Sequence, residues 1–495
     1  MAEVKAGSLA SLFNDVVALR TEVATGGTSL YRTWRDRIDR PAFAPSALNF
    51  AHYLAMRRID LRHLQRRLMV LGLSSLGRAE GHVLTTLDTI AWTLAQLSGS
   101  ESRRFPSDRR FFRGERKLRS NTAELFGPEH KGRIGRIMVT LGKEAAADPA
   151  FIADLAERGA DVVRINCGHD DATTWMRMIE NTRAAARIRP LRVLMDIAGP
   201  KVRMKEVVTP PDRPRMLVGD KILLCRRVDA WRADFPFQST CTPLGVLDRL
   251  KVGDVVSIDD GKLRGTIVGQ EDGGFAVNVT EGRNKGVKIK PGRGLNFPAV
   301  DLNLNPLTEK DRRDLDFVAR HADLVGFSFV QNGDQVAELQ RELAARQPDW
   351  QRLGMVAKIE TPAAVFNLPE IIVQAAGRQP LAVMIARGDL SVEMGFERVA
   401  EMQEEILWLC EAAQVPAIWA TQVLDGLIQE GLPSRSEMTD AAAAVQAECV
   451  MLNKGPNLTE GVSALDRLLR RMGENRVKKT PTLRALHSWP EKSHR

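Results

Sequence analysis

The feature that most constrains the fold is a series of eight short β-rich apolar segments, separated by stretches with helical spacing. Each segment except the third is followed, after a short loop, by a stretch that fits an amphipathic helix. Eight parallel strands with crossover helices are what a closed barrel requires, so we expect an α/β fold built on a (β/α)8 TIM barrel. The eight segments are residues 136–140, 161–166, 191–196, 323–329, 354–360, 381–386, 415–420 and 448–452.

The exception after the third segment predicts an inserted domain. Residues 206–296 hold no long helical pattern, and their short apolar or alternating runs are separated by Gly, Pro and Asp turns. We therefore expect a small antiparallel β domain, a β-barrel lid, at the carboxyl rim of the barrel. In that place it would close over a barrel active site.

The N-terminal region is expected to be helical. Residues 50–71 and 78–97 have apolar residues at helical spacing and are separated by Gly72, which predicts a helical hairpin. Residues 103–119 carry eight cations against Asp108 and Glu115. We interpret this stretch as a basic linker, or one that docks on an acidic face, rather than as a nucleic-acid arm. The expected division is 1–132 for the helices and linker, 133–205 and 297–475 for the barrel, 206–296 for the lid and 476–495 for a tail.

Composition excludes several classes of protein. The hydrophobic fraction of 44% and the charged fraction of 27% are those of an ordinary soluble globular protein. No apolar run is long enough to cross a membrane, and the start of the chain has no secretory signal, so we expect no membrane association. The five cysteines are scattered without C-x-x-C spacing, which predicts reduced thiols in a cytoplasmic protein and argues against structural zinc.

The carboxyl ends of the predicted strands are polar, although each follows an apolar run. In a (β/α)8 barrel the chemistry lies at these ends. One polar residue there would be ordinary, but polar residues in register at nearly every strand end indicate a site. They are Thr140, Arg164, Asn166, Asp196, Lys201, Arg203, Ser328, Lys358, Glu360, Arg387, Asp389, Thr421 and Asn453.

Two of these ends predict a metal site. Glu360 and Asp389 end adjacent strands, so their carboxylates can converge on one hard divalent cation, Mg²⁺ or Mn²⁺. Lys358 lies two residues before Glu360 and so points the same way from the strand. Alone, this pair would be explained equally well as an ordinary ion pair. With Asp389, Arg164 and Asp196 added, a cation beside a carboxylate-held metal favours transfer of a charged phosphoryl group.

Nine segments of the chain, in this order and on these elements, resemble the pyruvate kinase family. They are residues 164–169, 196–203, 258–261, 294–298, 327–329, 357–360, 386–390, 420–424 and 433–437. The resemblance implies that the chain transfers the phosphoryl group of phosphoenolpyruvate to ADP, giving pyruvate and ATP in glycolysis. It also implies a homo-oligomer, with nucleic acid not expected as a partner.

The resemblance assigns expected roles residue by residue. Lys358 would stabilise charge on the phosphoryl group in flight, and Glu360 with Asp389 would hold the divalent cation. Thr421 would lie near the proton-delivery path. The catalytic set is Lys358, Arg164, Thr421 and Lys201. The substrate-binding set is Arg164, Gly388, Asp389, Thr421 and Ser328. The nucleotide-binding set is Asn166, His169, Arg203 and Arg293, with Asp260 approaching from the lid.

The chain departs from the family at the monovalent-cation site. Most members hold this cation with an Asn, a Ser and an Asp–Thr pair. Here Asn166 and Asp196 remain as a remnant, but Gly168 and Ile197 stand at the Ser and Thr positions. Lys201 stands where cation-requiring members have Glu. We therefore expect its ammonium to supply the charge of K⁺, and the activity not to require K⁺.

Other departures leave two alternatives open. The loops 141–145 and 453–457 differ from the family pattern, so the same phosphoenol chemistry could serve a different acceptor or substrate. The resemblance ends near the barrel, without the usual C-terminal domain, and a helical region at 1–132 appears instead. The second alternative is a catalytically silent barrel whose N-terminal region binds a partner or nucleic acid.

Overall fold

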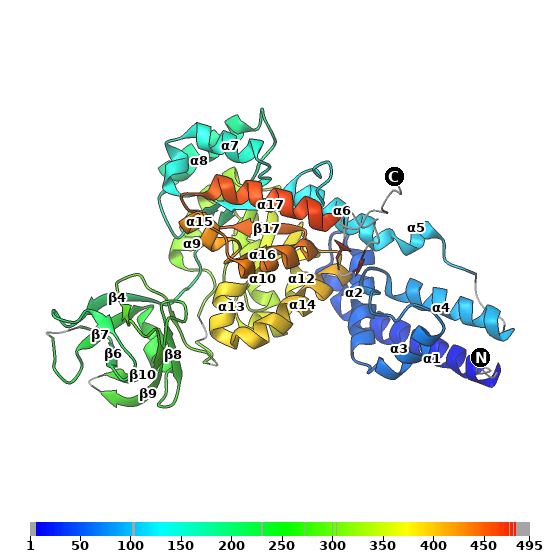
Figure 1. Cartoon of the computed structure of the whole chain (residues 1–495), viewed down its shortest axis with the longest axis horizontal. Helices are drawn as coiled ribbons and strands as arrows, with labels where there is room; N and C mark the ends of the chain where they lie inside the picture. Colours follow the sequence, from blue (N-terminus) through cyan, green and yellow to red (C-terminus); the bar gives the residue numbers. More distant parts are fainter. Residues whose placement is uncertain are drawn as a thin grey trace, which may run out of the picture.

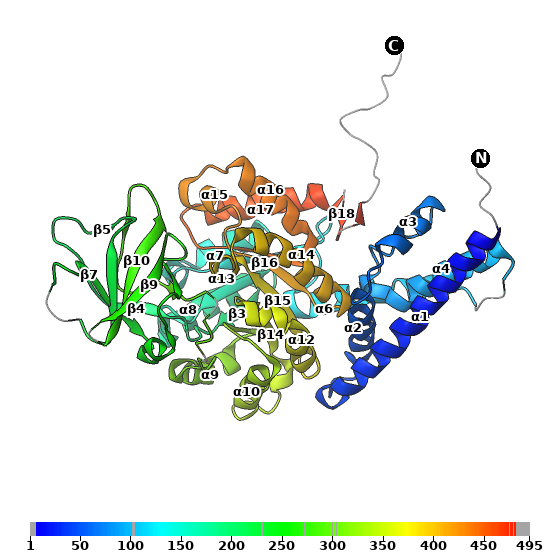
Figure 2. The same ribbon diagram turned by 90° about the horizontal axis from the view of Figure 1, so that it is seen from below.

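The computed structural model describes residues 6–100, 104–228, 231–271, 273–298, 300–302, 304–474, 476–478 and 480–481. Most of the tail predicted at 476–495 therefore lies outside the described residues. Figures 1 and 2 show three parts in a row: a β domain at one end, a barrel in the middle and a helical region at the other. None of the described helices combines the length and apolar content needed to cross a bilayer.

The middle part is a closed parallel barrel in the order β1-β17-β16-β15-β14-β13-β3-β2, which confirms the predicted fold. Its strands are β1 (Arg136–Thr140), β2 (Val162–Asn166), β3 (Arg192–Asp196), β13 (Leu324–Phe327), β14 (Gly354–Ile359), β15 (Leu381–Ala386), β16 (Ala417–Ala420) and β17 (Cys449–Leu452). The outer helices are α7 (Pro149–Glu157), α8 (Ala172–Ala185), α9 (Glu309–His321), α10 (Gly333–Ala344), α11 (Pro362–Phe366), α12 (Leu368–Ala376), α13 (Arg387–Met394), α14 (Phe396–Ala412), α15 (Asp425–Glu430), α16 (Arg435–Ala443) and α17 (Leu458–Gly473).

Side chains start the barrel helices at defined residues. Asp148 caps α7 by accepting the backbone N–H groups of Ala150 and Phe151, and Pro149 occupies the first turn. Thr308 and Asp311 form a reciprocal capping box at the start of α9. These caps determine the residue at which each helix begins. They therefore also determine the length of the loops that follow the polar strand ends.

The barrel interior is a separate apolar core that the N-terminal region completes. Leu125 and Phe126 pack with inward-facing residues of all eight strands, including Met138 and Met384. A Cβ added to Gly354, the first residue of β14, would lie 2.6 Å from a methyl group of Leu125. The end of the barrel where the strands begin is thus closed by α6 (Arg113–Phe126), whose last residues are these two.

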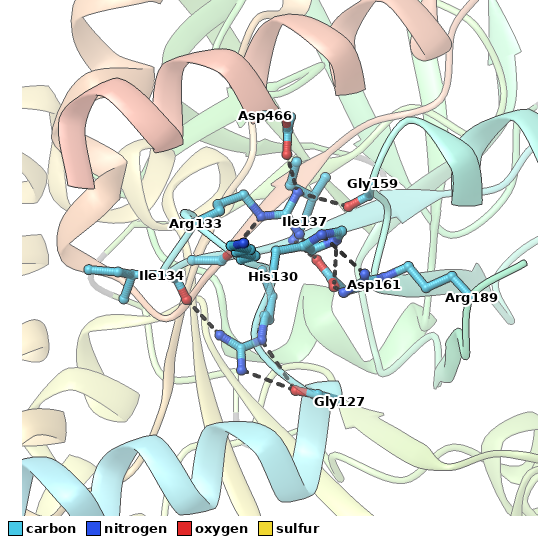
Figure 3. A network of polar contacts seen from close by, with 12 residues as sticks. Gly127, His130, Arg133, Ile134, Ile137, Gly159, Asp161, Arg189 and Asp466 are labelled. Carbon is cyan, nitrogen blue, oxygen red and sulfur yellow. Dashed lines mark hydrogen bonds and ion pairs between the residues drawn. The ribbon is translucent and has the colours of Figure 1, made fainter. Parts of the chain in front are cut away.

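A buried polar network lies at the same end of the barrel (Figure 3). Asp161 accepts from the guanidinium groups of Arg133 and Arg189 and, at 2.8 Å, from the backbone N–H of Ile137. Arg133 also donates to Asp466 of α17 at 2.7 Å and to the carbonyl oxygen of Gly159 at 2.9 Å. The network joins the segment before β1 to the α7–β2 loop, which holds Gly159 and Asp161, and to α17, which holds Asp466.

The β domain is a barrel-like seven-stranded sheet, inserted between β3 and α9 as predicted, in the order β12-β8-β9-β10-β6-β7-β4. Its strands pair antiparallel as expected except β6 and β7, which run parallel. Its strands are β4 (Arg203–Val208), β6 (Lys221–Cys225), β7 (Phe237–Thr242), β8 (Val255–Ile258), β9 (Leu263–Glu271), β10 (Gly274–Gly282) and β12 (Leu295–Asn296). A short pair, β5 (Arg215–Met216) and β11 (Val287–Lys288), lies beside it. Strand β4 straddles the boundary expected at 206. We call this part the lid domain.

The N-terminal helices are α1 (Ala6–Trp34), α2 (Ala44–Arg57), α3 (Arg62–Val70) and α4 (Val83–Ser98). The predicted hairpin of 50–71 with 78–97 is wrong, because the first segment breaks at Asp60, whose carboxylate accepts the N–H of Arg62. Helix α1 instead packs on both α2 and α4. Gly27 makes this possible, since a Cβ there would lie 2.3 Å from the His52 ring.

The stretch interpreted as a basic linker contains helices. They are α5 (Asp108–Phe111) and the longer α6. Asn121 of α6 donates to the carbonyl oxygen of Gln414 at 2.7 Å, and Asn49 of α2 donates to that of Ala412 at 2.8 Å. These contacts hold the helical region on the barrel at the end of α14.

Candidate active site

Lys358 is at the centre of the polar strand ends. Its ammonium lies 2.7 Å from Ser328 Oγ, 3.1 Å from Glu360 Oε1 and 3.2 Å from Asp196 Oδ2. Burial alone would lower the pKa of this ammonium, but the carboxylates of Asp196 and Glu360 outweigh burial and raise it. The barrel therefore holds a buried, charged lysine at the mouth of β14.

Asp196 positions a second cation beside the lysine. Arg164, on β2, donates from Nε to Asp196 Oδ2 at 2.9 Å and again from Nη2. Its Nη1 donates to Thr140 Oγ1 at 3.2 Å. Burial would raise the pKa of the Asp196 carboxyl, but Lys358 and Arg164 together lower it. Asp196 is thus an ionised anchor shared by two cations.

This depressed pKa makes a prediction about acid stability. Asp196→Asn is expected to lower the free energy of unfolding at pH 7 by about 1.5–3 kcal/mol, because it removes charge-assisted hydrogen bonds. A carboxyl whose pKa is lowered by folding stabilises the protein above its unfolded pKa of about 4, and loses that contribution as pH falls. Urea unfolding between pH 7 and 3.5 should therefore show the gap to wild type closing on acidification. A gap that widens would contradict this account.

Glu360 and Asp389 are the two carboxylates expected to hold a divalent cation. Glu360 is buried and accepts the backbone N–H of Phe329 at 2.6 Å, while Asp389 lies in the first turn of α13. Burial raises the pKa of Glu360 against the opposing effect of Lys358, and the nearby charges of Asp389 and Asp196 raise it further.

This arrangement fits a divalent cation, which would neutralise two repelling carboxylates. Within the described part of the chain no group of three metal-ligating side chains forms. Substrate oxygens and water would complete the shell, as is usual for Mg²⁺.

Lys201 connects the lid domain to this carboxylate pair. Its ammonium lies 2.6 Å from Asp389 Oδ1 on the barrel and 3.2 Å from Asp260 Oδ1 on the lid. Burial would lower the pKa of Lys201, but Asp389 and Asp260 outweigh it and raise the pKa. Lys201 therefore carries a fixed positive charge at the junction of the two domains.

Thr421 and Gly388 meet at the mouths of β15 and β16. Thr421 Oγ1 accepts the backbone N–H of Gly388 at 2.8 Å. Arg387 fixes the Thr421 loop by donating to the Thr421 carbonyl oxygen at 2.7 Å and to Asp440 at 2.9 Å. Thr421 adopts a left-handed backbone with φ of 66°, which is rare for a β-branched residue and is held here by these contacts.

The predicted nucleotide residues are only partly brought together. The pKa of His169 is lowered by burial and by the positive charges of Lys454 and Arg203. Its backbone N–H donates to the carbonyl oxygen of Asn166 at 3.0 Å. Arg293 instead pairs with Asp259 of the lid at 3.1 Å. Lys454 was missed, although it follows the last barrel strand in a loop with an unusual sequence.

The remnant of the monovalent-cation site has few free oxygen ligands. Asn166 Oδ1 accepts the backbone N–H of Gly168 at 2.9 Å. Asp196 is occupied by Lys358 and Arg164, and Ile197 is fully buried with an apolar side chain. The residues present are therefore poorly suited to K⁺, which binds through several oxygens.

Comparison with known proteins shows which family the barrel resembles. The family model described as the barrel domain of pyruvate kinase matches residues 132–457. The pyruvate kinase of Dictyostelium discoideum is 32% identical over 64% of this chain and 61% of its own. That of Methylorubrum extorquens is 35% identical over 65% of this chain and 64% of its own. This chain thus spans less than two thirds of either relative. A solved pyruvate kinase from Cryptosporidium parvum has a TM-score of 0.60 and 25% identity, covering 71% of this chain and 72% of that one.

Proposed function

The chain belongs to the pyruvate kinase family, and we propose that it transfers the phosphoryl group of phosphoenolpyruvate to ADP with a divalent cation and without K⁺. The observation that carries this proposal is the buried Lys358 ammonium, which contacts Ser328, Glu360 and Asp196 at the mouth of the barrel. An ordinary solvent-exposed loop at the end of a strand would not be expected to bury a lysine between two carboxylates.

In this proposal the cations at the barrel mouth bind the transferred group. Lys358 and Arg164 share the anchor Asp196, so both charges are fixed before the phosphoryl group arrives and no reorganisation is needed. Glu360 and Asp389 would hold Mg²⁺ or Mn²⁺, which when bound would neutralise charge on phosphate and enolate oxygens.

The remaining roles concern the acceptor and the substrate carboxylate. The start of α13 supports a carboxylate seat, where the N–H of Gly388 would turn from Thr421 Oγ1 to the substrate, and Thr421 would lie beside the carbon that takes up the proton. Asn166, His169 and Arg203 would take the nucleotide, and Lys454 adds a further cation there. Arg293 would join them only by leaving Asp259.

We propose that Lys201 replaces the monovalent cation. Its double contact with Asp389 and Asp260 supports a permanent charge at the lid junction, close to the divalent-cation ligands. Gly168 and Ile197 have no side-chain oxygen, which supports the same conclusion, because K⁺ would lack these ligands.

Lys201→Ala is expected to lower kcat by about 100-fold, since one fixed charge facing the reacting groups is lost. Adding KCl should not restore turnover, because the missing oxygen ligands remain missing. Lys205→Ala is the matched control: Lys205 is an exposed lysine on β4, in the same lid segment, and its loss should leave kcat unchanged. If K⁺ fully restored the turnover of the Lys201 variant, this site would bind K⁺ despite its few oxygen ligands, and the proposal would be contradicted.

The acceptor is tested separately from the donor. Release of pyruvate is measured with ADP and with other nucleoside diphosphates, since the loops 141–145 and 453–457 differ from the family pattern. Turnover with ADP supports the proposal. Turnover that is confined to a different acceptor supports the same phosphoenol chemistry with altered specificity. Absence of turnover with every acceptor supports a silent barrel.

The five cysteines are free and buried, which supports a reducing, cytoplasmic environment. Family membership supports a homo-oligomer, which sedimentation velocity measures directly.

A further inference from the structure

A cavity of about 820 Å³ lies in the N-terminal region, outside the barrel mouth. It is formed where α5 and α6 cross α2 and the start of α4, and Gln414 of the barrel contributes to its wall. A Cβ added to Gly114 of α6 would lie only 2.1 Å from the carbonyl oxygen of Gly81. The two backbones are thus in direct contact, so the wall of this cavity is built by packing and not by a loose linker.

The lining of this cavity is cationic. It includes the side chains of Arg109, Arg110, Arg113, Arg116 and Lys117 together with His52 and His82, and it contains no carboxylate. Among the described residues, Arg110 alone of these five cations forms an ion pair, with Asp88 at 3.4 Å. The side chains of Arg109 and Arg113 make no ion pair or hydrogen bond with any described residue.

Two further observations at the same place favour an anion. The pKa of Lys117 is lowered by burial and by the positive charge of Arg40, against the opposing effect of Glu124, so an anion at this ammonium would meet a partly desolvated cation. His52 is 6% exposed, and its Nε2 has no hydrogen-bond partner in the described part of the chain. A buried polar atom without a partner is costly, and it marks a place where a ligand can donate or accept.

We infer that this cavity binds a small molecule carrying two or more phosphate groups. Its volume lies within the range of small-molecule sites, about 300–1,000 Å³. Four cations that form no ion pair with a described residue exceed what a single phosphate would neutralise, which favours a polyphosphorylated ligand. Arginine forks on α5 and α6 match phosphate oxygens in geometry. The concave wall suits a compact anion better than a duplex, which needs an extended basic face.

The test uses full-length protein with inorganic pyrophosphate as the probe, and hydrogen exchange as a readout that locates binding. Pyrophosphate is expected to slow amide exchange in residues 107–120 of wild type. Arg113→Ala/Lys117→Ala should need at least about tenfold more pyrophosphate for the same protection, since two charge-assisted contacts are lost. Arg58→Ala/Arg66→Ala removes the same charge from exposed residues outside the cavity and should behave as wild type.

Amide exchange is measured in residues 107–120, so pyrophosphate that binds at the barrel mouth does not change this readout. The test of the cavity is therefore independent of the proposed activity. No protection of 107–120 at saturating pyrophosphate, or equal protection in the Arg113/Lys117 variant, would overturn the inference. A short DNA duplex that protects this segment at lower concentration than pyrophosphate would also overturn it, in favour of a nucleic-acid surface.

Discussion

Lys358→Met is expected to lower kcat by about three orders of magnitude while the protein stays folded. Methionine keeps most of the volume of lysine but removes the charge that faces Asp196, Glu360 and Ser328. A preorganised charge in a water-poor site contributes about 3–4 kcal/mol or more to the transition state, and this cation is the most buried one at the barrel mouth. Steady-state release of pyruvate with phosphoenolpyruvate, ADP and Mg²⁺ measures the effect.

The control for this variant is another ion-paired lysine, which is partly exposed. Lys478 pairs with Glu448 at the opposite end of the barrel, where β17 begins, and it donates to the carbonyl oxygen of Gln446 at 2.9 Å. Lys478→Met should cost stability comparable to the loss at Lys358 but leave kcat within a few fold of wild type. If Lys358→Met kept wild-type turnover, Lys358 would be a structural residue and the proposed chemistry would fail.

Asp161→Ala is expected to destabilise the protein by about 3–5 kcal/mol, the largest stability effect predicted for a single substitution in this chain. Asp161 and Arg133 are almost fully buried, so removing the carboxylate leaves two guanidinium groups, those of Arg133 and Arg189, without their shared acid (Figure 3). It also leaves the N–H of Ile137 without an acceptor. Urea unfolding of the variant against wild type measures the loss.

Asp154→Ala is the matched control, because Asp154 forms a half-exposed i,i+4 pair with Arg158 at the surface. Exposed pairs contribute about 0–1 kcal/mol, so this variant should unfold close to wild type. Below its unfolding transition, Asp161→Ala should keep its kcat, since the network lies at the end of the barrel away from Lys358. A stability loss no larger than that of Asp154→Ala would show that the network contributes little.

The barrel could be predicted from sequence because its signals are local. Each strand is a short apolar run that ends on a polar residue, and helix starts such as Asp148–Pro149 are written in adjacent residues. The pairing of Lys358 with Glu360 follows from the alternation of side chains along β14.

What could not be predicted depends on contacts between distant segments. Lys201 was expected to supply a charge, but its contacts with Asp389 and Asp260 join residues far apart in the chain. The helix α6 was not predicted, because the basic residues at its start resemble a linker. Only the packing of Leu125 and Phe126 inside the barrel shows the role of its end. The break at Asp60 was missed because a side-chain hydrogen bond to Arg62 outweighed the apolar periodicity.

The central claim is that Lys358, the carboxylate pair and Lys201 together perform phosphoryl transfer without a monovalent cation. The most direct measurement is pyruvate formation from phosphoenolpyruvate and ADP with Mg²⁺, in buffer where Na⁺ and K⁺ are replaced by a bulky organic cation, with KCl then added. The account predicts full turnover before KCl and no significant gain after it. Turnover that appears only on adding KCl would contradict the role of Lys201, and none in either condition would contradict the proposed reaction.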